Sequence, residues 1–118
     1  EALAPEMFDL MPRLSAFSGA SHVTDKMTYS AFGSPAFHDL LGALRPSALV
    51  LTGVETDVCV LATMLDAVDK GYRTILVEDA VTSASDSGHE AILEIARERF
   101  GEQIEVVDTE TLLKAWRP

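Results

Sequence analysis

Cys59 is the only cysteine of the chain, and its position suits a nucleophile. The apolar run 48–51 predicts a buried strand, 52–55 a short turn, and a helix then begins near Thr56 or Asp57, both good N-cap residues. Cys59 would lie in the first helical turn, where unpaired N–H groups and the helix dipole stabilise a thiolate over a thiol. The same N–H groups can hold a developing oxyanion. This arrangement favours attack on a carbonyl carbon, and the alternative is a small buried hydrophobic side chain.

Lys26 is the second candidate for chemistry, because it ends a short predicted strand around 22–24. The end of a strand is a suitable place for a partly desolvated amine, because burial lowers the pKa of a lysine and a nearby thiolate or carboxylate raises it. The alternative is an ordinary solvated lysine, since lysine is seldom buried. Asp79 follows the predicted strand 74–77 and faces the same edge of the sheet. We expect its carboxylate to accept N–H bonds from a loop.

Alternating strands and helices must position these side chains. Strands are predicted at 22–24, 48–51, 74–77 and 104–107. Helices are predicted at 36–44 with Ser34 as N-cap, from Thr56 or Asp57 to Lys70, from Ser87 to about Phe100, and from Asp108 or Thr109 onward. We expect Trp116, in the last helix, to pack against the sheet. The helix that stops at Gly71 has apolar residues spaced by three and four, which predict its buried face: Val58, Leu61, Ala62, Leu65 and Val68.

This alternation indicates parallel βαβ units with right-handed crossovers. The predicted fold is therefore a three-layer α/β/α sandwich with a mainly parallel sheet. The strand, turn and helix around Cys59 would present its sulfur at the C-terminal edge of that sheet, where ligands bind in open α/β folds.

The composition restricts partners and location. The chain of 118 residues carries a formal net charge of −10, which argues against nucleic acid or an anionic membrane as a partner. No apolar run approaches the roughly 20 residues that span a bilayer, and no secretory signal is visible. A single cysteine cannot form an internal disulfide, so we expect a cytoplasmic protein. The three histidines have no metal-site spacing.

Four segments carry a family resemblance: DKMTYSAF at 25–32, GVETDVCV at 53–60, ATMLDAVDKGY at 62–72 and VEDAVTS at 77–83. Together they closely resemble the isochorismatase-like cysteine hydrolase superfamily, which includes nicotinamidases and related amidases. The resemblance runs from about Asp25 to Ala91 and continues weakly to the end. It implies an Asp–Lys–Cys triad, in which Cys59 matches the nucleophile and Lys26 the lysine.

The resemblance also implies details of the site. The family carries a non-proline cis peptide before the nucleophile helix, which here would be Val54–Glu55. The N–H groups of Glu55 and Cys59 would form the oxyanion hole. Val54 would line the substrate pocket, and Tyr29 and Phe32 would either line it or pack beside it.

The N-terminal part of the family pattern has no counterpart here. Members begin with an apolar strand that ends in Asp-x-Gln and supplies the triad aspartate, and we assign that role to neither Asp9 nor Asp25. We therefore expect residues 1–118 to be a single, N-terminally incomplete domain, the C-terminal part of a longer enzyme. The strand 48–51 would then have a bare edge and the strand 22–24 no neighbours. We expect a homo-oligomer or association with the missing segment. The family's metal ligands lie in the absent region, so no metal is predicted.

The expected activity is cysteine-dependent hydrolysis of a small amide or related C–N bond through an acyl-enzyme at Cys59, without a cofactor. The isolated chain, which lacks the aspartate, is expected to be inactive. One alternative is an isochorismatase-type hydrolase of a vinyl ether, which need not use a cysteine here. Another is a truncated, non-catalytic member that serves as a binding or scaffold module.

Overall fold

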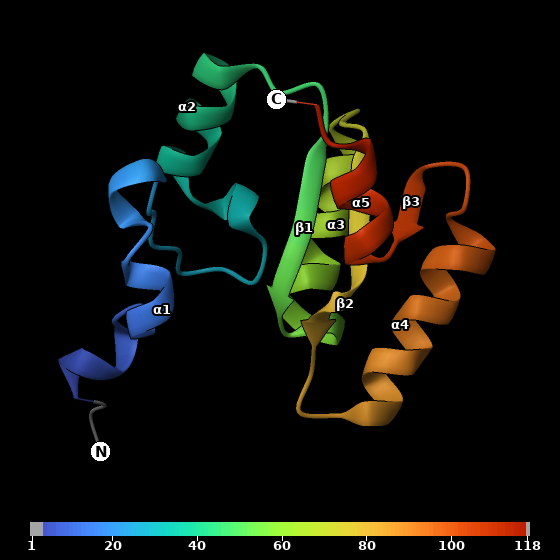
Figure 1. Ribbon diagram of the computed structural model, residues 1–118, viewed down its shortest axis with the longest axis horizontal. Coiled ribbons are helices and arrows are strands. Elements are labelled where there is room, and N and C mark those ends of the chain that lie inside the picture. Colours follow the sequence, from blue (N-terminus) through green and yellow to red (C-terminus); the bar gives the residue numbers. More distant parts are fainter. Residues whose placement is uncertain (1–3, 118) are drawn as a thin grey trace.

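The computed structural model describes residues 4–117 and alternates strands with helices (Figure 1). Within these residues the strands are β1 (Leu49–Val54), β2 (Thr74–Thr82) and β3 (Ile104–Val107). The α-helices are α1 (Pro12–Ser15), α2 (Pro35–Leu44), α3 (Leu61–Asp69), α4 (Asp86–Arg99) and α5 (Thr109–Ala115). Short 3₁₀ turns occupy Pro5–Phe8, Ser18–Ala20 and Ala31–Gly33, and a π-helical turn, η4, occupies Thr56–Val60. No helix between residues 4 and 117 is long and apolar enough to cross a membrane.

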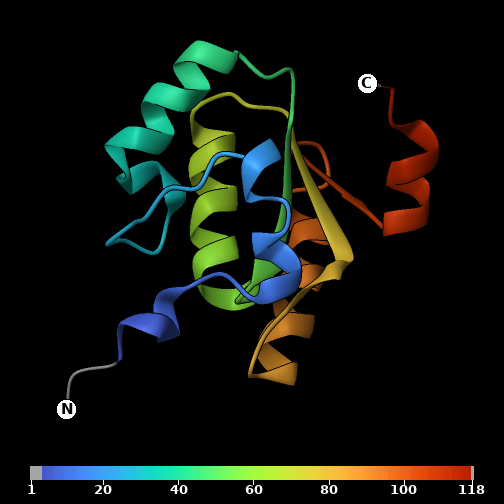
Figure 2. The ribbon, with the colours of Figure 1, turned by 60° about the vertical axis from the view of Figure 1, so that its left-hand side comes forward.

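The strands form one parallel sheet in the order β1-β2-β3. Right-handed crossovers through α3 and α4 place both helices on the same face of the sheet. The last helix, α5, lies on the opposite side of the strands from α3 (Figure 2). The chain therefore has the predicted α/β fold, with helices on both faces of a parallel sheet.

One edge of the sheet is open. Among the described residues β1 pairs only with β2, from Leu49 opposite Thr74 to Val54 opposite Thr82. The prediction of a strand at 22–24 is wrong, because these residues are exposed and belong to no sheet. The physical reason is that a strand needs a neighbour's hydrogen bonds, and residues 22–24 are paired with none of the described strands. We call the unpaired side of β1 the free edge.

The core lies between the sheet and the two helices on its α3 face. Met64 of α3 and Leu76 of β2 are fully buried, and Ile104 of β3 is nearly so. Other members of the same cluster come from η4, β2 and α4: Val60, Val81, Leu93 and Ala96. The same packing therefore holds η4, which carries Cys59, against the sheet.

The buried face of α3 differs from the predicted one. The structure buries Val60, Thr63, Met64 and Ala67, whereas Leu65 is 37% exposed. The predicted residues other than Leu65 are half-buried. Apolar side chains occur on more than one side of this helix, so its periodicity allowed two buried stripes. Contact with the sheet and with the turn Ala31–Gly33, whose Ala31 N–H donates to the Thr63 Oγ1, selects the one that includes a threonine.

This correction predicts unequal effects of two adjacent substitutions. Met64→Ala should lower the free energy of unfolding by about 2–3 kcal/mol, because it leaves a cavity in the core. Leu65→Ala should cost about 1 kcal/mol or less, because part of that side chain is already in water. Urea unfolding followed by circular dichroism measures both, with the denaturant slope as a check on two-state behaviour. Equal losses would mean that the predicted stripe is the buried one.

Of the predicted helix caps, Ser34 caps α2 as expected, accepting a hydrogen bond from the Phe37 N–H at 3.4 Å. Asp108 caps α5 as predicted, accepting a hydrogen bond from the Thr111 N–H at 2.7 Å, and this bond holds the pKa of its carboxyl below the ordinary value. The prediction for α4 is wrong: Ser85 is the cap, and it accepts from the Gly88 N–H at 3.0 Å. A serine at either position fits the local pattern, and the hydrogen bond from the Ser85 N–H to the Ser83 Oγ at 3.1 Å holds the turn in which Ser85 becomes the cap. Trp116 is 53% exposed beyond the end of α5, so its predicted packing is also wrong.

Candidate active site

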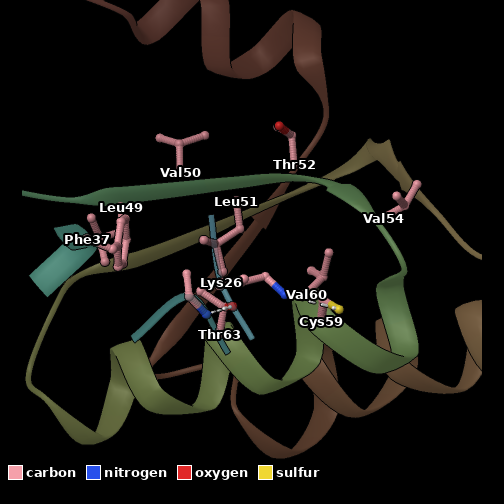
Figure 3. Close-up of a pocket in the computed structure, with 11 residues that line it drawn as sticks. Lys26, Phe37, Leu49, Val50, Leu51, Thr52, Val54, Cys59, Val60 and Thr63 are labelled. Carbon is pink, nitrogen blue, oxygen red and sulfur yellow. Dashed lines mark hydrogen bonds between the residues drawn. The ribbon is translucent and has the colours of Figure 1, made fainter. Parts of the chain in front are cut away.

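A cavity of about 360 Å³ lies beside the free edge of β1 (Figure 3). Leu49 and Leu51 point from β1 toward α3, whereas Val50 and Thr52 point away from it. Residues from β1, from η4 and α3, and from the segment 26–37 line the cavity: Lys26, Ala31, Phe37, Leu49, Val50, Leu51, Thr52, Val54, Cys59, Val60 and Thr63. The two candidates for chemistry, Cys59 and Lys26, are both in this wall.

Lys26 and Cys59 are in direct contact although 33 residues separate them in the sequence. The Lys26 Nζ lies 3.6 Å from the Cys59 Sγ and also donates to the Thr28 carbonyl oxygen at 2.7 Å. Cys59 is half-buried, so a substrate or an alkylating reagent in the cavity can reach its sulfur. The contact thus brings the lysine side chain directly against the sulfur in the wall of the cavity.

The loop that carries Lys26 is anchored to α3. The buried Thr63 accepts a hydrogen bond from the Ala31 N–H at 3.0 Å through its Oγ1. Thr28 packs against Gly33 so closely that a Cβ added at this glycine would lie 2.0 Å from the Thr28 Oγ1. These contacts fix the loop that presents Lys26 to Cys59. Sequence reasoning missed Thr63, because a threonine on an amphipathic helix gives no local sign of a partner in a distant loop.

The turn before Cys59 contains the cis peptide Val54–Glu55 that the resemblance implies. The predicted N-cap is wrong, because neither Thr56 nor Asp57 caps the helix. The residue at that position is Glu55, whose carbonyl oxygen accepts from the N–H groups of Val58 and Val60, each at 3.1 Å. Those two N–H groups are therefore engaged within the turn. The Glu55 and Cys59 N–H groups remain the candidates for an oxyanion hole.

The three candidate pocket residues have different surroundings. Val54 lines the cavity and is 62% exposed. Tyr29 lies outside it and lines a separate open hollow with Lys26. Phe32 also lies outside it: its ring packs edge-on against Phe37 at 5.3 Å and beneath the Lys70 Nζ at 5.3 Å. Tyr29 and Phe32 thus lie beside this cavity, the second of the two positions that the sequence left open for them, and Phe37 lines its wall.

The remaining polar candidates do not join this site. Asp79 accepts hydrogen bonds from both the N–H and the Oγ1–H of Thr109, each at 2.8 Å, so it holds the start of α5 as expected. Between residues 4 and 117 no three histidine, cysteine, aspartate or glutamate side chains come close enough together to hold a metal ion.

Comparison with known proteins adds to this geometry. The Isochorismatase domain family matches residues 2–108. The chain belongs to the isochorismatase family. It is 36% identical over 80 residues to an uncharacterized isochorismatase family protein, PncA, of Bacillus subtilis, covering 68% of this chain and 44% of that protein. It is 33% identical over 82 residues to the maleamate amidohydrolase of Pseudomonas putida, covering 70% of this chain and 38% of that enzyme.

Solved structures of the family have the same fold. The nicotinamidase PncA from Bacillus subtilis superimposes with a TM-score of 0.71 at 28% sequence identity, over 84% of this chain and 56% of the nicotinamidase. The chain thus spans only about two-fifths to three-fifths of the length of these three relatives. Two of these relatives are named for an activity, the maleamate amidohydrolase and the nicotinamidase.

Proposed function

We propose that the complete protein is a cysteine-dependent hydrolase of a small amide or related C–N bond. The observation that carries this proposal is the 3.6 Å contact between the Lys26 Nζ and the Cys59 Sγ in the wall of an open cavity. A lysine beside a half-buried cysteine is an arrangement that favours a reactive thiolate. The names of the maleamate amidohydrolase and the nicotinamidase support an amide as the substrate class.

The proposed reaction proceeds in two stages. The Cys59 thiolate adds to the amide carbonyl carbon, and the resulting oxyanion is held by the Glu55 and Cys59 N–H groups. The C–N bond then breaks, the amine leaves with a proton, and a thioester to Cys59 remains. Water attacks this thioester, releases the carboxylic acid and restores the thiolate. Lys26 stabilises the thiolate at the beginning and at the end of the cycle.

The proton for the leaving amine requires a carboxylic acid near the sulfur. We assign it to an aspartate outside this sequence, on a strand that pairs with the free edge of β1. That strand belongs to the rest of the protein or to a second subunit. In this position it would also close the open side of the cavity, which β1 lines. The proposed chemistry uses no organic cofactor and, in this segment, no metal. A lone reduced cysteine in this role fits the cytoplasm.

The free edge of β1 also favours a second candidate, a non-catalytic module that binds another polypeptide by strand addition. Binding by strand addition does not require the contact between Lys26 and Cys59, so this contact favours the enzyme over the module. A vinyl-ether hydrolase of the isochorismatase type remains a third candidate, which does not require the cysteine.

Alkylation of Cys59 separates the thiolate enzymes from the binding module. At about pH 7 iodoacetamide should modify Cys59 at least about 10-fold faster in the folded chain than in urea, because an unperturbed thiol is mostly protonated there. Cys59 is the only thiol, so intact-mass measurement follows it directly. A panel of small amides, including nicotinamide and maleamate, tested beside isochorismate on the complete enzyme then separates amidase from vinyl-ether chemistry. Slow alkylation in the folded chain, or cleavage of isochorismate alone, would contradict the proposal.

A further inference from the structure

The two residues at the start of η4 use their side chains on the far side of the turn from the cavity. Thr56 is fully buried, and its Oγ1 lies 2.8 Å from the Nδ1 of His89 on α4. The Asp57 carboxylate accepts a hydrogen bond from the Ser83 Oγ at 2.6 Å. These are the third and second residues before Cys59. Both are therefore fastened to the beginning of α4, and neither caps its own helix.

The contact with α4 leaves no room for a Cβ at position 88 unless the Asp57 carboxylate moves. A Cβ added at Gly88 would lie 2.1 Å from the Asp57 Oδ2 and 2.9 Å from its Cγ. The partners of Asp57 are themselves held in place, because the Ser83 Oγ accepts from the Ser85 N–H at 3.1 Å and Ser85 caps α4. The carboxylate thus sits against a fixed surface beside the first turn of α4, where a negative charge is also favoured by the helix dipole.

The fold does not depend on these contacts to attach α4. Leu93 and Ala96 bury this helix in the core, and Arg97 forms an ion pair with Glu78 of β2 near its other end. The contacts of Thr56 and Asp57 instead fix the position of the turn that leads to Cys59. Thr56 directly follows Glu55, whose N–H is a candidate oxyanion donor.

We infer that Thr56 and Asp57 are positioning residues, which dock η4 on the first turn of α4 and thereby set the placement of the Cys59 thiolate and of the nearby N–H donors. The inference rests on the proposed function, because it assigns the docking to a thiolate that reacts. The Thr56 hydroxyl can donate to a neutral His89 ring or accept from a protonated one, so this hydrogen bond survives titration of the imidazole.

Two glycines at opposite ends of α4 provide a matched test. A Cβ at Gly88 meets Asp57, whereas a Cβ at Gly101 meets only the Arg97 carbonyl oxygen, at 2.7 Å. Gly88→Ala should slow the alkylation of Cys59 by iodoacetamide about 10-fold at about pH 7, and the rise in rate with pH should move to higher pH. Gly101→Ala should leave the alkylation rate within about twofold of that of the unmodified chain and should not move the rise in rate with pH, because this glycine is remote from the site. Both variants should lower the melting temperature.

The assay uses the complete protein, follows Cys59 in its peptide by mass spectrometry, and records alkylation from about pH 6 to about pH 10 together with thermal melting. Equal alkylation rates in Gly88→Ala and Gly101→Ala would overturn the inference. Failure of the proposed function is distinguishable, because the unmodified folded chain would then react no faster than the chain in urea.

Two further variants identify Asp57 as the group through which Gly88 acts. In an Asp57→Ala background the carboxylate is gone, so adding Gly88→Ala should slow alkylation by no more than about twofold further. An undiminished 10-fold effect in that background would overturn the assignment to Asp57. If Gly88→Ala does not melt cooperatively, Ser83→Ala decides, since it removes the hydrogen bond to Asp57, together with the one from the Ser85 N–H, and adds no atoms. A loss of about threefold in alkylation rate supports the inference, and an unchanged rate overturns it.

Discussion

Cys59→Ala in the complete enzyme is expected to lower kcat/KM for the amide substrate by about 10⁴-fold or more. Alanine offers no nucleophile, so neither the acyl-enzyme nor its hydrolysis by water can occur. The substitution keeps the backbone N–H of residue 59, which is one of the two candidate oxyanion donors. It therefore removes the sulfur and leaves the electrostatic part of the site in place, which makes the loss a measure of covalent catalysis.

Steady-state rates and intact-mass spectra check this prediction together. With a slowly released substrate the unmodified enzyme should gain the mass of the acyl group, and Cys59→Ala should gain none. Gly42→Ala is a suitable control, since a Cβ on this exposed residue of α2 meets no atom within 4 Å. Turnover by Cys59→Ala at the full rate would exclude a thioester and would favour the vinyl-ether alternative.

The parts of the fold that depend on local signals could be predicted from the sequence. The stop of α3 is one example: Gly71 has a φ of +83°, and the N–H groups of Gly71 and Tyr72 donate to the carbonyl oxygens of Val68 and Ala67 at 2.9 and 3.0 Å. A glycine after an amphipathic run is typical of this C-terminal motif. The alternation of apolar strands with such helices then indicated a parallel sheet, because only crossovers of this length join parallel strands.

Long-range contacts decided what the sequence could not. Thr56 and Asp57 have the residue types of N-caps, yet each is drawn to a partner on or near α4, 33 and 26 residues away. A cap preference describes the competition between a side chain and its own backbone. It carries no information about a better partner elsewhere. The position of the helix start therefore depended on a tertiary contact that no local pattern contains.

The same limit applies to the wall of the cavity. Phe32 and Phe37 are both aromatic residues near Lys26, and the sequence alone gave no reason to prefer either as a lining residue. In the structure Tyr72, which lies just after α3, packs against the Phe32 ring at a centroid distance of 5.9 Å. This contact and the Lys70 Nζ above it hold Phe32 away from the cavity. The pairing of Lys26 with Cys59 was likewise indicated by the family resemblance and by nothing in the spacing.

Lys26→Met is expected to lower kcat/KM by about 10²-fold and to slow alkylation of Cys59 at neutral pH. Methionine keeps the length of the side chain but removes the ammonium group that lies 3.6 Å from the Sγ. Two unit charges about 4 Å apart near a protein surface attract each other by about 4 kcal/mol. Solvent around the exposed lysine screens part of this attraction, so the loss should fall below the full value.

Lys70→Met is the matched control, because it makes the same change in net charge at a lysine whose Nζ lies over Phe32. Both variants have one positive charge fewer, but only Lys26→Met removes a charge that lies next to the Cys59 sulfur. The deficit in alkylation should be largest at low pH and should close as the pH rises above about 9, where even an unassisted thiol is ionised. A deficit of the same size at every pH would mean that Lys26 acts on access to the sulfur and not on its charge. If Lys26→Met and Lys70→Met reacted equally fast, the contact between Lys26 and Cys59 would have no part in forming the thiolate.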